Sequence, residues 1–207
     1  MEKLINLANQ AQGLFDKVRT QVDFLGPLAL RLYLVPVFWV AANNKWNPFD
    51  SSSSINSTAE WFGNAEWGLG LPLPYLNAYM AWGAEYFGAI LLLLGLGVRW
   101  ISIPLMVTMI VAVTTVHWEH GWQALNDPKS AFASEHADEA IERLAVAKDI
   151  LREHGDYGWL TEFGGIVSSN NGIEWAATYF VMLLALLCFG AGRFVSLDYW
   201  IARRFRR

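Results

Sequence analysis

The hydrophobic residues of this chain are gathered into four long segments separated by polar stretches. The segments run from about 24 to 43, 75 to 98, 100 to 118 and 175 to 195. Each is long enough to cross a bilayer core, which takes about 20 helical residues. A buried helix of a soluble bundle would carry a polar stripe at helical spacing, and the runs 89–94 and 101–113 carry none. The pattern predicts an all-α, polytopic membrane protein, a four-transmembrane-helix bundle forming one domain over residues 1–207.

Two polar loops, residues 44–74 and 119–173, separate these segments on one side of the expected membrane. The longer loop contains an additional amphipathic helix from about 132 to 153, because apolar residues recur there at helical spacing and Gly155 follows as a stop signal. We expect this helix to lie on the membrane surface or to cap the bundle. Residues 1–23 are polar and amphipathic, unlike a cleavable signal peptide.

Composition and charge support this class and exclude several others. Of the 207 residues, 54% are hydrophobic and only 16% are charged, which excludes a disordered chain. The single cysteine, Cys188, excludes a disulfide scaffold, thiolate metal binding and dithiol redox chemistry. A net charge of −4 gives no general attraction to nucleic acid.

The distribution of Lys and Arg predicts the topology. Most of them lie in residues 1–26, at the turn containing Arg99, and from Arg193 to the C-terminal end, whereas the longer loops hold fewer. By the positive-inside rule, both termini are expected to be cytoplasmic and both loops to lie outside. The basic run 203–207 fits a topology anchor or a contact with anionic lipid better than a nucleic-acid site.

Apart from Arg193 near the end of the fourth segment, two charged residues, Arg31 and Glu85, fall inside the expected spans. A charge in a span is costly unless it is paired or reaches water, so each is a candidate functional residue. Two interpretations stay open: a structural ion pair that docks the first two helices, or a proton-carrying or quinone-binding site. Several tryptophans around the outer ends of these helices fit an interfacial aromatic belt or a ligand cage: Trp39, Trp46, Trp61, Trp67 and Trp82.

The outer end of the third segment carries an HxxH pattern, with Glu119 between His117 and His120. Residues three apart share a helix face, so both imidazoles and the acid are candidate metal ligands. The other histidines, His136 and His154, lie in the same outer loop. The alternative is that these are ordinary residues of a membrane interface. No nucleotide-binding loop and no nucleophile arrangement is present in the sequence, so no intrinsic catalytic activity is expected.

The ordered motifs of the four segments resemble the DoxX family of small four-helix membrane proteins, and within it the HvfX-type subgroup encoded with maturation proteins for copper-binding, ribosomally made peptides. The family motifs include Arg31, Glu85, Arg99, His117 and Arg193. The subgroup stretches are residues 58–63, 67–72, 99–105 and 170–174, and the long outer loop.

This resemblance implies a bacterial inner-membrane accessory protein, working beside peptide-maturation proteins and a copper-binding peptide, in its maturation, export or docking. Other DoxX relatives are subunits of thiosulfate:quinone oxidoreductases, so a quinone-linked membrane subunit is the alternative. A structural partner subunit without chemistry is a further alternative. Copper and quinone are the corresponding candidate cofactors.

Overall fold

The computed structural model describes residues 1–205, and these residues are mostly helical, with one isolated β-bridge and no longer strand. The chain forms two compact units. Unit 1 comprises Met1–Thr108 together with the chain from Phe180 onward, and unit 2 comprises Met109–Tyr179. The all-α fold class expected from the sequence is confirmed for the described residues.

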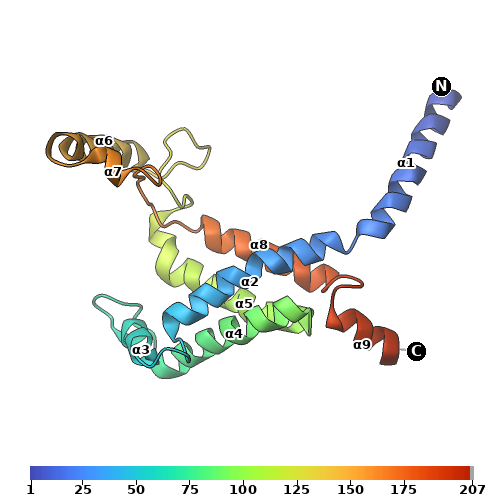
Figure 1. Cartoon of the computed structure of the whole chain (residues 1–207), viewed down its shortest axis with the longest axis horizontal. Helices are drawn as coiled ribbons and strands as arrows, with labels where there is room; N and C mark the ends of the chain where they lie inside the picture. The colour runs from blue at the N-terminus through green and yellow to red at the C-terminus, as the bar shows by residue number, and fades with distance from the viewer. Residues whose placement is uncertain (206–207) are drawn as a thin grey trace. The chain divides into compact units, whose positions relative to one another are not determined.

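Unit 1 is built around two long helices, α2 (Leu25–Lys45) and α4 (Pro74–Leu94), which pack against each other in opposite directions (Figure 1). Arg31 near the start of α2 bonds the end of α4, and Lys45 at the end of α2 reaches back into α4. Residues 98–108 of α5 (Val98–Ala112) and 180–189 of α8 (Glu174–Phe189) complete the unit's apolar core. The fully buried core side chains include Leu34, Phe38, Leu92, Leu105, Leu183 and Leu186.

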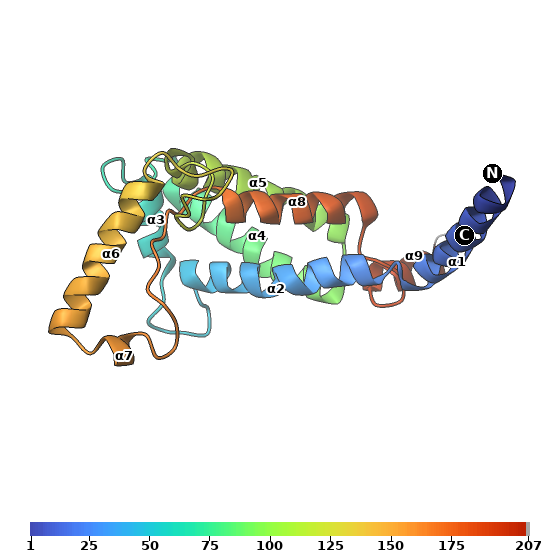
Figure 2. The same cartoon turned by 90° about the horizontal axis from the view of Figure 1, so that it is seen from above.

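Two further helices, α1 (Glu2–Val22) and α9 (Leu197–Phe205), lie at the same end of unit 1 (Figure 2). A short helix, α3 (Ile55–Gly63), lies between α2 and α4 in the chain, in a region expected to be loop. Ser54 caps α3 by accepting a bond from the amide of Asn56. Three of its residues then pack on α4 in a small cluster: Ile55, Ala59 and Phe62 against Ala78.

Among residues 1–205, two helical stretches are long and apolar enough to cross a membrane, Leu25–Lys45 and Val98–His120. The second combines α5 with a π-helical turn (Val113–His117) and a 3₁₀ turn (Trp118–His120). The other two expected spans correspond to α4, which has 21 residues but includes Glu85, and to α8, which has 16. The structure thus supports two spans by length and composition, and four spans stay a prediction.

The helix ends differ from the expected boundaries where glycines turn the backbone. The second apolar segment was expected to continue to 98, but α4 ends at Leu94 because Gly95 takes a left-handed φ of 64°. The fourth was expected to reach 195, but α8 ends at Phe189, before Gly190 and Gly192 with φ of 80° and 87°. Only glycine adopts such angles without steric cost.

Unit 2 contains the amphipathic helix of the long loop, α6 (Ala137–His154), and a single-turn helix, α7 (Tyr157–Leu160). The helix begins at 137 rather than 132, and Gly155 follows it as expected. Residues 121–126 run beside 168–174, joined by backbone bonds such as Gly172 N to Gln123 O, 2.8 Å. A Cβ on Gly172 would lie 2.3 Å from that carbonyl oxygen, so this close approach requires glycine.

The outward surfaces of α2, α4 and α5 are apolar. Large hydrophobic side chains stay exposed along all three helices, among them Leu32, Val40, Met80, Phe87, Leu93, Ile103 and Val107. Soluble monomers rarely expose so much contiguous apolar surface. This surface fits a lipid environment, in agreement with the apolar spans.

Candidate functional site

Arg31 is the most deeply buried charged residue of unit 1, with 1% of its surface exposed. Its guanidinium donates to four backbone carbonyls. Nε bonds Leu92 O at 2.7 Å and Nη2 bonds Leu93 O at 2.9 Å, while Nη1 bonds Ala191 O at 2.9 Å and Val195 O at 3.2 Å. The last carbonyls of an α-helix lack intrahelical partners, and a cation there also interacts favourably with the helix dipole. Arg31 therefore caps α4 and ties it to the loop after α8.

Two further arginines, Arg99 and Arg193, also bond backbone carbonyls at helix ends. Arg99 Nη2 bonds Cys188 O at 3.2 Å, near the end of α8. Arg193 bonds the Thr20 carbonyl near the end of α1, and pairs with Asp23 at 2.9 Å. Three helix C-termini thus each receive an arginine, which matches the sign of the helix dipole.

The N-terminus of α5 is capped by an acidic residue, Asp198. The carboxylate of Asp198 accepts bonds from the amide of Gly97, just before α5, at 2.7 Å and from that of Val98, the first residue of α5, at 3.0 Å. Asp198 thereby caps a helix that begins about one hundred positions earlier in the chain. We call the residues Arg31, Arg99, Arg193 and Asp198 the capping cluster; its contacts stabilise helix ends.

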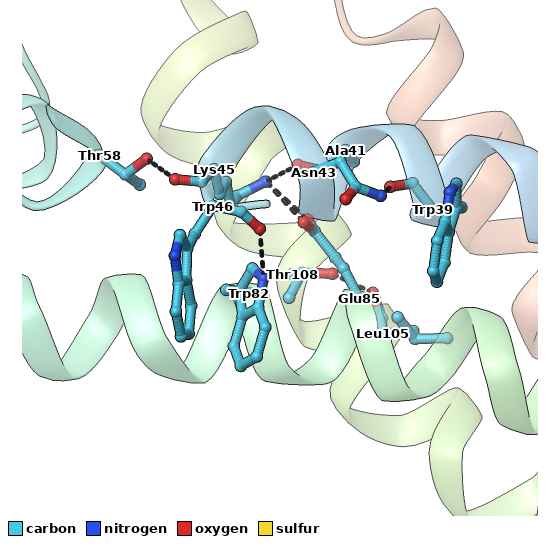
Figure 3. A network of polar contacts seen from close by, with 10 residues as sticks. All are labelled: Trp39, Ala41, Asn43, Lys45, Trp46, Thr58, Trp82, Glu85, Leu105 and Thr108. Atoms are coloured by element: carbon cyan, nitrogen blue, oxygen red, sulfur yellow. Dashed lines mark hydrogen bonds and ion pairs between the residues drawn. The ribbon is translucent and has the colours of Figure 1, made fainter. Parts of the chain in front are cut away.

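Glu85 lies near the other end of α2, where it forms an ion pair with Lys45 (Figure 3). Lys45 Nζ is 2.7 Å and 2.9 Å from the two carboxylate oxygens, and 3.5 Å from the Ala41 carbonyl. The side chains are 5% exposed for Glu85 and 22% for Lys45. The Lys45 carbonyl in turn accepts a bond from Thr58 Oγ1 at 3.0 Å, so α3 helps to position the pair.

Aromatic residues follow both members of this ion pair in the chain, Trp46 after Lys45 and Tyr86 after Glu85. Trp82 Nε1 donates to the Trp46 carbonyl at 2.8 Å, and the two indoles lie 4.6 Å apart (Figure 3). Tyr86 stacks on Trp82 at 5.1 Å and lies 5.2 Å from Trp39. The row of Trp46, Trp82, Tyr86 and Trp39 therefore runs along the same stretch of α2 and α4 as the pair. Two of the outer tryptophans, Trp61 and Trp67, are not part of these ring contacts.

Beside the row lies an open surface hollow of about 330 Å³. Its lining residues are Trp39, Val40, Asn43, Asn44, Asn47 and Phe49. A hollow of this size lies at the lower end of the range for small-molecule sites.

The structure answers the question of whether Arg31 and Glu85 pair. Their hydrogen-bond partners are different groups at opposite ends of α2: backbone carbonyls for Arg31, and Lys45 for Glu85. The interpretation as a direct Arg31–Glu85 ion pair is wrong. Arginine reaches carbonyls that the helix end leaves unpaired, and the first cation beyond the apolar segment, Lys45, reaches back to the carboxylate.

Sequence reasoning missed Lys45 and Asp198 as site residues. Lys45 is the first cation after the first apolar segment, and its position directly after that segment was the available signal. Asp198 opens a short amphipathic helix, which marks it as a potential cap. Its target, 100 residues away, carries no signal in the local sequence.

The histidines lie in unit 2. His117 Nδ1 is 2.7 Å from the Asn171 carbonyl oxygen, and Asn170 Nδ2 bonds the His120 carbonyl at 2.5 Å. Within residues 1–205 no three His, Cys, Asp or Glu side chains gather in a way that would hold a metal ion. His117, Glu119 and His120 are thus not assembled as a three-ligand site, and the metal site stays a prediction.

The apolar spans and the exposed apolar surface define the class as a helical membrane protein. Residues 26–118 match the model of the DoxX family, a range that includes Arg31, Lys45, Glu85, Arg99 and His117. The match is to the family and does not extend to the HvfX-type subgroup. Searches among curated proteins and solved structures found no match to this chain.

Proposed function

We propose that the chain is a four-span protein of the bacterial inner membrane, with both termini cytoplasmic, that serves as a membrane subunit of a quinone-linked oxidoreductase. The thiosulfate:quinone type is the example that the DoxX resemblance offers. The observation that carries this proposal is the Lys45–Glu85 ion pair, which is largely buried and has a row of aromatic rings along the same stretch of α2 and α4.

The ion pair suits a proton-transfer role. Reduction of a quinone to a quinol takes up two electrons and two protons. In this proposal the electrons come from a partner subunit that oxidises a reduced sulfur compound, since the chain has one cysteine and no dithiol. Glu85 and Lys45 are both titratable and 2.7 Å apart, so a proton can pass between them and on to a quinone oxygen.

The surroundings suit a quinone ring. Flat rings stack on aromatic side chains, and Trp39 joins the aromatic row to the surface hollow. Asn43 and Asn44 add amide groups to the lining of the hollow, where a quinone carbonyl would find donors. The hollow opens to the outside of unit 1, so a lipid-soluble quinone would enter from the bilayer.

The test is quinol formation by the complex containing this chain, measured spectrophotometrically in membranes with a soluble quinone. Glu85→Gln is expected to lower the rate about a hundredfold, because positioned acid–base groups contribute roughly that much. Glu85→Asp, which keeps the carboxyl group, is expected to recover part of it. Glu139→Gln removes a matched but exposed glutamate on α6 and is expected to leave the rate unchanged.

Loss of folding would imitate loss of proton transfer. The double variant Lys45→Met with Glu85→Gln removes both charges together, so it is expected to fold while staying inactive. Full activity of a folded double variant would overturn the proposal.

A second candidate function, accessory work in copper-peptide maturation, rests on how His117 is held. The stretch 170–174, one of those shared with the HvfX-type subgroup, supplies the Asn171 carbonyl that contacts His117 Nδ1. A carbonyl on one ring nitrogen favours the tautomer whose other nitrogen, Nε2, has a lone pair for a metal. His120 lies nearby in the chain, and copper accepts imidazole ligands.

Copper titration of the purified protein tests this candidate. His117→Ala and His120→Ala are expected to weaken copper binding about tenfold or more. His154→Ala, at the far end of α6, serves as the control. Unchanged affinity in both variants would remove this function. If neither candidate survives its test, the chain is a structural partner subunit.

A further inference from the structure

Helix α1 carries an apolar stripe along an exposed surface. Six of its large hydrophobic residues are exposed and lie on one side of a helix at 100° per residue, whereas Ile5 lies outside this stripe. The six are Leu4, Leu7, Leu14, Phe15, Val18 and Val22. Such spacing puts them on one face of the helix. An amphipathic helix of this length, with its apolar face uncovered, has surface to bury against something outside the chain.

Helix α9 repeats the arrangement at the same end of unit 1. Leu197, Trp200, Ile201 and Phe205 are all exposed, and Arg203 and Arg204 lie among them. Trp200 Nε1 bonds the Phe194 carbonyl at 2.8 Å, and the Arg203 guanidinium lies 5.5 Å from the centre of the Trp200 ring. Aromatic residues beside arginine are typical of helices at the membrane interface.

The junction between α1 and α2 is tied to the loop before α9. Arg193 pairs with Asp23 at 2.9 Å and bonds the Thr20 carbonyl. The rings of Phe24 and Phe194 contact each other edge to face, 5.8 Å apart. The end of α1 and the loop that leads into α9 are thus fixed against each other beside the start of α2.

The charges that remain uncommitted on these helices are mainly basic. Asp23 is paired with Arg193, and Asp198 is engaged with two backbone amides. Asp16 accepts a bond from Gln12 and lies 3.7 Å from Arg19. The remaining charged side chains on the two helices are four basic ones, Lys3, Lys17, Arg203 and Arg204, and one acidic one, Glu2. They complement the negative headgroups of an anionic leaflet.

We propose that α1 and α9 lie together in the headgroup region of an anionic bilayer leaflet, with their apolar faces turned into the lipid and their basic residues on the phosphates. The surface is continuous with α2, an apolar helix long enough to span that same bilayer, so it begins where α2 leaves the hydrocarbon core. The inference depends on α2 crossing the membrane and is independent of any redox or copper function.

The test uses the full chain reconstituted in vesicles of phosphatidylcholine with phosphatidylglycerol. In a Cys188→Ser background, a single cysteine carries an environment-sensitive fluorophore at Leu7→Cys on the apolar face or at Asn9→Cys on the polar face. The label at position 7 is expected to emit at shorter wavelength, resist aqueous iodide and be quenched by lipids carrying a nitroxide about 5–10 Å below the headgroups. The label at position 9 is expected to show the reverse. Ile201→Cys reports on α9 in the same way.

Charge is tested by changing the lipid and the protein. In vesicles of phosphatidylcholine alone, binding of the two helices to the membrane surface is expected to weaken. It is also expected to weaken in the variant that combines Lys17→Gln, Arg203→Gln and Arg204→Gln, where the equilibrium constant for surface binding should fall about fivefold for each residue neutralised. Arg143→Gln with Lys148→Gln on α6 removes basic charge elsewhere and is expected to change nothing at position 7. Labels at positions 7 and 9 that are equally open to iodide would overturn the proposal. So would strong proximity between the position-7 labels of two copies, because the stripe would then bind a second chain.

Discussion

The two ends of α2 hold buried charges in contrasting ways. At its start, Arg31 is surrounded by four backbone carbonyls, none of which changes charge. Near its end, Lys45 faces Glu85, and both partners can gain or lose a proton. The Arg31 contacts join helix ends through uncharged backbone groups, whereas the Lys45–Glu85 contact joins two side chains of opposite charge. One buried charge is therefore satisfied by neutral backbone groups and the other by a counter-charge, so the two ends of α2 are expected to respond differently to substitution.

The largest effect is expected from Arg31→Met. Removing the guanidinium leaves four carbonyls at helix ends without their donor, and each buried unpaired group costs about 1–3 kcal/mol. We expect the free energy of unfolding in detergent to fall by about 4 kcal/mol or more, measured by denaturant titration. Arg31→Lys should recover only part of the loss, because an ammonium lacks the planar fork of five donors. Full stability of Arg31→Lys would contradict the multidentate role.

The second-largest effect is expected at the Lys45–Glu85 ion pair, and it distinguishes an ion pair from the helix cap formed by Arg31. Glu85→Gln alone leaves Lys45 buried without its counter-charge and is expected to cost about 3–5 kcal/mol. The double variant Lys45→Met with Glu85→Gln should restore most of that stability, whereas no single second change is expected to rescue Arg31→Met. A double variant no more stable than Glu85→Gln would show that the pair does not act as a unit. Thermal unfolding of all variants in one detergent makes the comparison.

A smaller effect is expected from Gly95→Ala beside Arg31. Gly95 has a φ of 64°, and a Cβ there would lie 2.7 Å from the Arg31 guanidinium carbon. The left-handed conformation alone costs a non-glycine residue about 1–2 kcal/mol, and the displaced arginine adds to it. We expect a loss of about 2–3 kcal/mol in the free energy of unfolding. Gly83→Ala is the control, because its Cβ meets no atom within 4 Å.

The smallest effect is expected from Asp198→Ala, which removes the cap on the first amides of α5. Helix N-caps contribute about 1 kcal/mol. The unfolding midpoint should shift slightly, and hydrogen exchange should speed up at the amides of Gly97 and Val98 but not in α2. Unchanged exchange at those amides would mean that water replaces the carboxylate without loss.

The sequence predicted the helical class and the approximate positions of the apolar helices because long runs without a polar stripe depend only on local composition. It also located Arg31 and Glu85 as unusual, since charge inside an apolar segment is visible in one dimension. Their partners could not be predicted, because the Ala191 and Val195 carbonyls lie 160 positions or more from Arg31 along the chain. Backbone carbonyls are also available everywhere, so they leave no mark in the sequence.

The helix ends and short helices show the same limit. Gly95, Gly190 and Gly192 stop α4 and α8 earlier than the apolar runs suggest, and which glycines of an apolar stretch turn the backbone depends on the neighbouring packing. The sequence did not predict helix α3, because the polar residues around it are typical of a loop. Ile55, Ala59 and Phe62 nevertheless share the face that packs on α4.

The length of α8 has a consequence for the lipid around the protein. Sixteen residues rise about 24 Å, whereas the 21 residues of α2 rise about 31 Å. In the four-span arrangement, a bilayer core of about 30 Å fits α2 but overhangs α8, so the membrane must thin or bend beside that helix. Hydrophobic mismatch of this kind favours lipids with shorter acyl chains. When the protein is reconstituted into bilayers of lipids with a series of acyl-chain lengths, its stability is expected to be highest in a bilayer thinner than about 30 Å.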